Sequence, residues 1–301
     1  MADPLGEEDD LVAAFQVDGH AARGRIARMG KALDSILSAH DYPPAVKRLV
    51  GEAVLLAALV GDSLKFDGRL IIQANGNGNG PVTFVVAEWN SGGAVRGFAQ
   101  YSSDPVKDDA NVPELLGTGS FAMTIDPGEE MERYQGVVAL EGERLGQCAE
   151  RYFAQSEQTP TRIKLAVGES IHAGGKSNWR GGGAILQQIA ADDTRGDASA
   201  DWDHCRALFE TIADDELIDP DISAGNLIYR LFHEDGARLF EPKSLSKHCP
   251  CNRERLVEIL VRFSAEEQAE MLENGKVGMT CEYCNKLFEF TPNEIDNANR
   301  S

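Results

Sequence analysis

Four cysteines lie close together in the last fifth of this chain and constrain how that part can fold. They form two pairs, Cys249 with Cys251 and Cys281 with Cys284, in C-x-C and C-x-x-C spacing with 29 residues between the pairs. Each pair can hold one metal ion through two sulfurs, and the intervening chain is long enough to fold back. The spacing therefore predicts a tetrahedral Cys₄ zinc site formed by all four residues, or a redox pair.

The same sulfurs are candidates for oxidation, because zinc binds cysteine as the thiolate, which is the form that oxidants attack. A disulfide sulfur cannot hold the metal. A segment of about 45 residues has too small a core to fold unaided, and structural zinc supplies about 10–16 kcal/mol to such folds. Metal loss should therefore unfold residues 245–291. The spacing alone leaves both structural zinc and an oxidant-triggered unfolding switch open.

Length and charge exclude several classes of function. A chain of 301 residues can form one large core and a smaller module. Its net charge of −20, from 49 acidic and 29 basic residues, argues against a nucleic-acid partner and against an anionic membrane surface. The longest apolar stretch, around residues 54–60, is too short to span a bilayer and contains Glu52 in its flank.

The start of the chain carries no secretory signal. Residues 1–10 are acidic, where a signal peptide would be basic and then apolar, so we expect a disordered acidic tail there. Six cysteines without such a signal indicate a reducing compartment, and the cytoplasm is the natural expectation.

Residues 11–183 have the pattern of an α+β core domain with a mostly antiparallel sheet and flanking helices. Strand patterns follow one another with few helices between them, which is typical of antiparallel sheets. We expect a strand over 12–17, a helical pattern from Ile26 to Leu37 and a buried helix from Pro44 to about Leu64. A helix is also expected over 143–155. The further strands are expected at 69–73, 82–86, 94–99, 121–125, 135–140 and 161–167.

A glycine-rich passage, Gly174 to Gly183, is expected to end that domain. The pattern of residues 184–244 then predicts an acidic, amphipathic helical linker with two short helices. Ser223 can cap the second of them. Such short helices need a surface to pack on. The first apolar stripe comprises Trp202, Cys205, Leu208, Phe209, Ile212 and Leu217, and the second Leu227, Ile228, Leu231 and Phe232.

Residues 245–291 are predicted to form a zinc-binding redox-switch domain, followed by a disordered tail over 292–301. Arg253 to Phe263 has helical spacing, and Ser264 with Glu267 forms a capping box for the next helix, which should end at Asn274-Gly275. Strands over 277–280 and 287–290 bracket the second cysteine pair as a hairpin.

Other motifs are weaker. Gly175-Lys176-Ser177 resembles the end of a phosphate-binding Walker loop, but Ser170 stands where the motif needs glycine, so a flexible connection is favoured. His248 is a spare zinc ligand only if the four thiolates do not already close the site. No nucleophile motif appears, which indicates that the protein is not an enzyme. The other histidines form no metal-spaced pair and are expected on the surface or in the core: His20, His40, His172, His204 and His233.

Two further cysteines lie outside the motif. Cys148 falls in a predicted helix and should be a small buried hydrophobe. Cys205 lies on the first linker stripe; burial is favoured, with a sensitive thiol as the alternative.

Several segments together resemble a known family. Residues 65–73, 134–142 and 152–158, with the C-x-C and C-x-x-C tail, are similar to the 33-kilodalton heat-shock proteins, which are redox-regulated holdase chaperones of bacteria. The resemblance covers residues 11–290 in order. The chain departs from the family in its acidic N-terminal extension, its long Asn-Gly loop at 75–80 and the acidic stretch after residue 191.

The resemblance implies a reduced, inactive monomer with one zinc ion per chain. It also implies that oxidation pairs Cys249 with Cys251 and Cys281 with Cys284, after which zinc leaves and the tail and linker unfold. The protein then binds unfolding client proteins without ATP, often as a homodimer. The rival interpretation is a constitutive zinc-ribbon adaptor that binds a protein partner. Zinc content before and after peroxide distinguishes the two.

Overall fold

The chain forms two compact units, Met1–Lys247 and His248–Ser301, and each is described by itself. The computed structural model describes residues 9–64, 67–128, 132–171, 177–190 and 198–299. Most of the expected acidic tail, residues 1–8, lies outside these ranges. Asp9 and Asp10 do not belong to a disordered tail. Asp9 pairs with Arg180, and Asp10 accepts backbone hydrogen bonds from Gly30 and Ala32 at the start of helix α1.

The first unit contains two six-stranded sheets. The first sheet is antiparallel, with the order β10-β1-β2-β9-β8 and β11 paired to β1. Its strands are β1 (Leu11–Val17), β2 (Ala22–Met29), β8 (Thr161–Ile171), β9 (Ser177–Gln188), β10 (Ala237–Leu239) and β11 (Lys243–Ser244).

The second sheet has the order β12-β5-β4-β3-β6-β7 and is antiparallel except for the short β12–β5 pair. Its strands are β3 (Arg69–Gly76), β4 (Val82–Asn90), β5 (Ala94–Tyr101), β6 (Gly119–Asp126), β7 (Tyr134–Ala139) and β12 (Ser246–Lys247). The short helices beside the sheets are α1 (Lys31–Leu37), α3 (Val112–Leu116) and α4 (Leu145–Tyr152), and a π-helical turn, Phe153–Glu157, extends α4.

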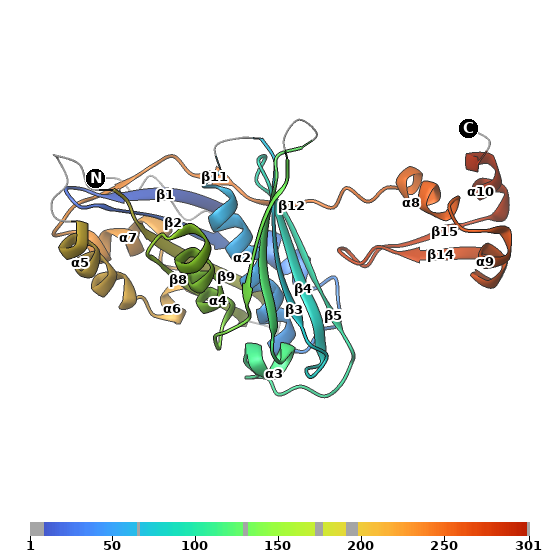
Figure 1. Cartoon of the computed structure of the whole chain (residues 1–301), viewed down its shortest axis with the longest axis horizontal. Coiled ribbons are helices and arrows are strands. Elements are labelled where there is room, and N and C mark those ends of the chain that lie inside the picture. Colours follow the sequence, from blue (N-terminus) through green and yellow to red (C-terminus); the bar gives the residue numbers. More distant parts are fainter. Residues whose placement is uncertain (1–8, 65–66, 129–131, 172–176, 191–197, 300–301) are drawn as a thin grey trace. The chain divides into compact units, whose positions relative to one another are not determined.

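Helix α2 (Pro44–Gly61) lies between the two sheets and packs against both (Figure 1). Its sequence is apolar on nearly every side, as an enclosed helix requires. Pro44 at the first helical position needs no backbone partner for its nitrogen. The main core of the unit forms around this helix, and the one acidic side chain that it buries is Glu52.

Three helices cover the other face of the first sheet: α5 (Ala198–Glu210), α6 (Asp214–Ile218) and α7 (Ala224–Phe232) (Figure 1). Their apolar stripes form a second core with side chains of β1, β2, β8 and β9. Ser223 caps α7 by accepting a hydrogen bond from the backbone of Asn226 at 3.1 Å. The rings of Phe232 and Phe15 lie 5.9 Å apart. The sheet is therefore the packing surface that these short helices need.

The glycine-rich passage is not a flexible domain boundary. Strand β9 runs through the expected break at residue 183, and Gly181, Gly182 and Gly183 are buried within it. A side chain on Gly182 would overlap the carbonyl oxygen of Leu217 in α6. The glycines allow helices to approach the strand on both faces. Residues 174–176, which include most of the Walker-like segment, lie outside the described residues.

Two segments that were expected to be helical contain strands instead. Ile26 and Met29 belong to β2 and not to a helix, because their spacing of three also fits a strand that is buried on both faces. The linker is not helical up to residue 244, since β10 and β11 pair with β1 and satisfy its outer backbone groups. Residues 191–197 of the linker lie outside the described residues.

The second unit is small and has a three-stranded sheet, β13-β14-β15. Its buried core consists of Leu260, Val277, Phe288, Phe290 and Ile295. The elements are α8 (Arg253–Leu260), α9 (Ala265–Glu270), β13 (Leu272–Glu273), β14 (Lys276–Thr280), β15 (Leu287–Phe290) and α10 (Pro292–Asn299). The capping box at Ser264 is present, and β14 and β15 form the expected hairpin.

The expected disordered tail over 292–301 was wrong for most of its length, because α10 occupies residues 292–299. Ile295 is buried against the small core, and the Glu294 carboxylate accepts hydrogen bonds from the Thr291 backbone at 2.8 Å and from Arg253 at 2.6 Å. The unit also begins later than residue 245, since Leu245 is buried in the core of the first unit and β12 pairs with β5.

Candidate metal centre

The four motif cysteines converge in the second unit. Cys249 and Cys251 precede α8, whose first turn is capped by Asn252. Cys281 and Cys284 lie in the turn between β14 and β15. All four sulfurs lie within 4.8 Å of one another, and no described histidine, His248 included, joins this group.

Local hydrogen bonds shape the turn that carries the second pair. The Cys281 nitrogen donates to the Lys286 carbonyl at 3.0 Å, and the Asn285 nitrogen donates to the Cys281 carbonyl at 2.8 Å. Asn285 has φ of 55°, a left-handed conformation that asparagine tolerates better than most residues. The turn directs both sulfurs to the side on which the first pair lies.

The distances fit a tetrahedral metal ion. The Cys249 and Cys281 sulfurs are 3.6 Å apart, and the Cys251 and Cys284 sulfurs are 3.4 Å apart. A zinc–sulfur bond of about 2.3 Å places neighbouring sulfurs of a tetrahedron about 3.8 Å apart. A disulfide needs about 2.05 Å, so these are free thiols. The four cysteines can therefore bind a thiophilic metal, and zinc suits such a donor set.

The thiols differ in their readiness to ionise. Burial raises the pKa of Cys251 and of Cys281. Burial also acts to raise the pKa of Cys249, but hydrogen bonds from the Cys251 backbone and the neighbouring thiols outweigh it and lower this pKa overall. Cys251 and Cys281 also pack against the small core, so the site and the core of the unit are continuous.

The two remaining cysteines are buried, as expected. Burial raises the pKa of Cys148 in α4 to about 11 and that of Cys205 in α5 to about 12. Both thiols are therefore neutral and shielded in this structure. Cys148 belongs to the main core, whereas Cys205 is covered only as long as the linker helices stay on the sheet.

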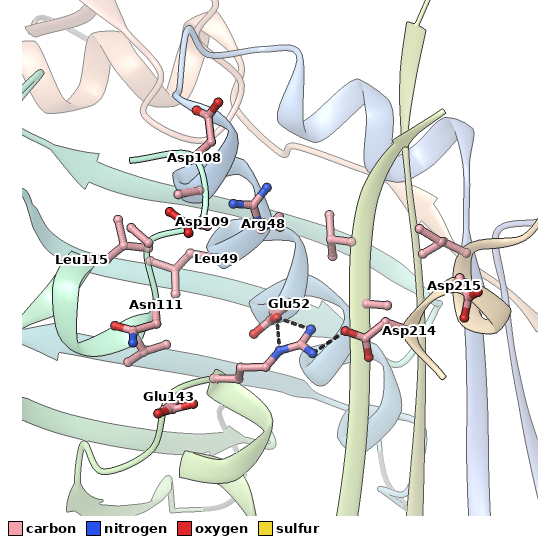
Figure 2. Close-up of a pocket in the computed structure, with 17 residues that line it drawn as sticks. Arg48, Leu49, Glu52, Asp108, Asp109, Asn111, Leu115, Glu143, Asp214 and Asp215 are labelled. Atoms are coloured by element: carbon pink, nitrogen blue, oxygen red, sulfur yellow. Dashed lines mark hydrogen bonds and ion pairs between the residues drawn. The ribbon is translucent and has the colours of Figure 1, made fainter. Parts of the chain in front are cut away.

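A pocket of about 690 Å³ lies between α2, α3, β8 and α6, with Glu143 and Arg144 just before α4 also in its lining. In Figure 2, Glu52 and Asp214 point at one guanidinium between them, which belongs to Arg144. Arg144 lies 2.8 Å from the Glu52 carboxylate and 2.7 Å from that of Asp214. Burial raises the pKa of Glu52, and the charge of Arg144 opposes that effect. The Arg144 guanidinium thus ties Glu52 of α2 to Asp214 of α6.

One further cluster of possible metal ligands matches no motif in the sequence. His20, His204 and Asp235 offer ligand atoms within 4.8 Å of one another. The residues are far apart in the chain and have no motif spacing, so only the fold brings them together.

Comparisons with known proteins agree on one family. A family model described as "Hsp33 protein" matches residues 10–291. A 33 kDa chaperonin of Caulobacter vibrioides is 49% identical, and the match covers 97% of this chain and 98% of the relative. A 33 kDa chaperonin of Yersinia pestis is 38% identical over 95% of this chain and 94% of its own length.

The fold is also that of a solved structure. The crystal structure of the 33 kDa chaperonin (Heat shock protein 33 homolog) from Thermotoga maritima has a TM-score of 0.81 to this chain, with 22% identity and coverage of 97% and 98%. Among the residues that the structure describes, no helix combines the length and apolarity needed to cross a membrane.

Proposed function

Because the chain belongs to the Hsp33 family, we propose that it is a redox-regulated, ATP-independent holdase chaperone. The observation that carries the proposal is a four-thiol site set into a small unit, among whose described residues five form the buried core. A unit of this kind needs a metal to stay folded, and its ligands are oxidisable groups. Zinc is the metal that we propose, one ion per chain, held by Cys249, Cys251, Cys281 and Cys284.

In the reduced state the bound metal supplies about 10–16 kcal/mol to the fold of the second unit. The chain's own contribution there is small, since most side chains of α8 and α9 are exposed. The linker helices meanwhile keep Phe15, Ile26 and Leu186 of the first sheet buried. We propose that this form is inactive because its apolar client-binding surface is covered.

We propose that oxidation of the thiolates removes the metal ligands and so unfolds the second unit. A peroxide takes two electrons from a thiolate pair, one S–S bond forms, and the O–O bond breaks to give water. We propose pairing within each motif, Cys249 with Cys251 and Cys281 with Cys284. Disulfide sulfurs no longer serve as thiolate ligands, so the second unit loses the free energy that keeps it folded.

The linker then loosens. Two-residue strands, β11 and β12, carry the chain from α7 towards Cys249, and each makes only a short ladder with its neighbour. Helices as short as α6 and α7 are not stable by themselves in water. Undocking exposes the apolar face of the sheet together with Phe209 and Phe232, and a surface of that kind binds unfolding proteins.

The remaining assignments follow from this role. The partners are unfolded or aggregation-prone client proteins, with a homodimer as the oxidised form and neither nucleic acid nor membrane as a partner. The cytoplasm is the proposed compartment, since thiols stay reduced there until stress. The net charge of −20 keeps a protein with an exposed apolar face soluble. We propose no enzymatic activity.

Metal analysis and light scattering test the proposal. Reduced protein should contain one zinc per chain, and the Cys281→Ser/Cys284→Ser variant should contain much less. Chelation should abolish amide protection in α8 and α10 while α2 stays protected.

Peroxide-treated protein should suppress aggregation of a heat-denatured client without ATP, and reductant should reverse this. Equal protection by reduced and oxidised forms would refute the redox switch. Full zinc retention after peroxide would favour the constitutive adaptor.

A further inference from the structure

Two histidines and two aspartates form a compact cluster between the linker helices and the first sheet. His20 lies in the turn between β1 and β2, His204 on α5, and Asp235 in the turn between α7 and β10. The two imidazole rings are stacked with centroids 5.3 Å apart. Nε2 of His204 lies 3.0 Å from both oxygens of Asp235, and Nε2 of His20 lies 3.2 Å from one of them. Asp201 completes the cluster, 3.0 Å from Nδ1 of His20.

The arrangement needs a positive charge. His20 faces a carboxylate at each ring nitrogen, and a neutral imidazole has one N–H to donate. If Nδ1 donates to Asp201, the lone pair on Nε2 points at the carboxylate of Asp235. A cation between them removes this repulsion, and so does a second proton on the ring. Two carboxylates and two neutral imidazoles carry a net charge of −2, which attracts a divalent cation.

A divalent metal ion meets this need more completely than one proton does. A proton on His20 would leave the cluster with a net charge of −1, whereas a divalent ion would neutralise it and accept both Nε2 lone pairs at once. Metal–nitrogen and metal–oxygen bonds of about 2.0–2.1 Å place neighbouring ligand atoms of a tetrahedron about 3.3 Å apart. The separations of 3.0 and 3.2 Å are close to that value. Asp201 would then hold the other nitrogen of His20, as a carboxylate commonly does behind a metal-bound histidine.

We propose that His20, His204 and Asp235 form a second metal site, distinct from the four cysteines, for a divalent transition metal such as Zn²⁺. Imidazole ligands suit zinc, copper and nickel and do not suit calcium or magnesium. The His204 side chain is 47% exposed, so water can complete the coordination and the ion can reach the site.

The site would join the first sheet to the linker, and these two parts must come apart when the linker undocks. His20 belongs to the sheet, while His204 and Asp235 belong to the linker, and all three lie in the first unit. An ion held by all three residues binds only the docked linker. At a free metal concentration 100-fold above the dissociation constant, the ratio of docked to undocked linker rises about 100-fold. The metal would thus oppose undocking, whatever triggers it.

The test uses the full-length reduced protein already loaded with one equivalent of zinc. Calorimetry measures the binding of further Zn²⁺ to wild type, His204→Gln and Asp201→Asn. His233→Gln is the matched control, because His233 is an exposed histidine near the same turn and its ring contacts the Arg230 carbonyl. Hydrogen exchange of α5 amides is the second measurement, and it does not depend on chaperone activity. A Co²⁺ titration shows whether the added ion has thiolate ligands.

We expect wild type and His233→Gln to bind one further Zn²⁺ and to gain protection in α5. The Asp201→Asn variant should bind about 10- to 100-fold more weakly, and His204→Gln should lose at least as much. Cobalt at this site should show no thiolate charge transfer. The proposal is overturned if wild type binds no second equivalent, or if His204→Gln binds as wild type does. Neither result bears on the four-cysteine switch.

Discussion

Removal of one buried ring should undock the linker of the reduced, metal-bound protein. Phe232 is fully buried at the end of α7, and its ring lies 5.9 Å from that of Phe15 on β1. Truncation of a buried phenylalanine to alanine costs about 3–5 kcal/mol. If that loss falls on the docked state, the undocked population rises roughly 100- to 5,000-fold. The main core around α2 is a separate cluster and should be unaffected.

Cys205 reports this opening. Burial, and to a lesser degree the charges of Asp235 and Asp201, raise its pKa to about 12. At pH 8 about one docked thiol in 10⁴ is ionised, whereas about a quarter would be at the ordinary pKa of about 8.5. The docked thiol is also fully buried, so alkylation at pH 8 should pass through the undocked form. Since the pKa is higher in the docked state, docking should also lose stability as the pH rises from about 8.5 towards 12.

The assay is the alkylation rate of Cys205 at pH 8, measured by mass spectrometry on reduced protein with zinc bound. The Phe232→Ala variant should react about 100-fold faster or more than wild type. Tyr229→Ala is the matched control, because Tyr229 lies on the same helix and is 67% exposed. Cys148 is the internal control, with its pKa raised by burial to about 11 in the main core. Unchanged Cys205 rates in Phe232→Ala would refute the reasoning, and a parallel rise at Cys148 would indicate global unfolding.

Two further substitutions test other contacts of the linker. Gly182→Ala should displace α6, because its new Cβ would overlap the Leu217 carbonyl, and faster hydrogen exchange in α6 with unchanged protection in α2 would bear this out. Arg144→Ala should cost about 3–5 kcal/mol in urea denaturation, because it leaves the buried Glu52 carboxylate without its positively charged partner. Asp214→Asn should cost under about 1 kcal/mol, since Asp214 is 56% exposed; similar losses in both variants would contradict this account.

The sequence by itself determined the helices, caps and strands that depend on interactions between residues close together in the chain. The apolar run of α2 is long enough to predict a buried helix, and the cap at Ser223 and the capping box at Ser264 mark true helix starts. Strands β3 to β7 of the second sheet lie where alternation predicts them, and β3 to β6 extend beyond the predicted ranges. The two-residue strand β12 of the same sheet was not predicted. Hydrogen bonds and side-chain periodicity act within a few residues, so local pattern suffices for these elements.

Tertiary structure decided the elements whose local signal was weak or ambiguous. Ile26 and Met29 have a spacing that fits a helix or a doubly buried strand, and only the neighbouring strands and helices select the strand. Gly181 to Gly183 look like a flexible connection until α2 and α6 pack on either side of β9. Helix α10 is held on the second unit by the burial of Ile295 and by Arg253, 41 residues away, which donates to Glu294. Each of these outcomes depends on a partner that is distant in the chain.

The candidate sites divide in the same way. The cysteine site was predictable because chelation needs two ligands a few residues apart, and the C-x-C and C-x-x-C spacing meets that requirement. The cluster of His20, Asp201 and Asp235 joins residues separated by 181 and 215 positions, and the pair of Glu52 and Arg144 spans 92. No short sequence motif predicts pairs of residues that lie so far apart in the chain. They exist only because packing of the linker on the sheet, and of α4 beside α2, brings their charges together.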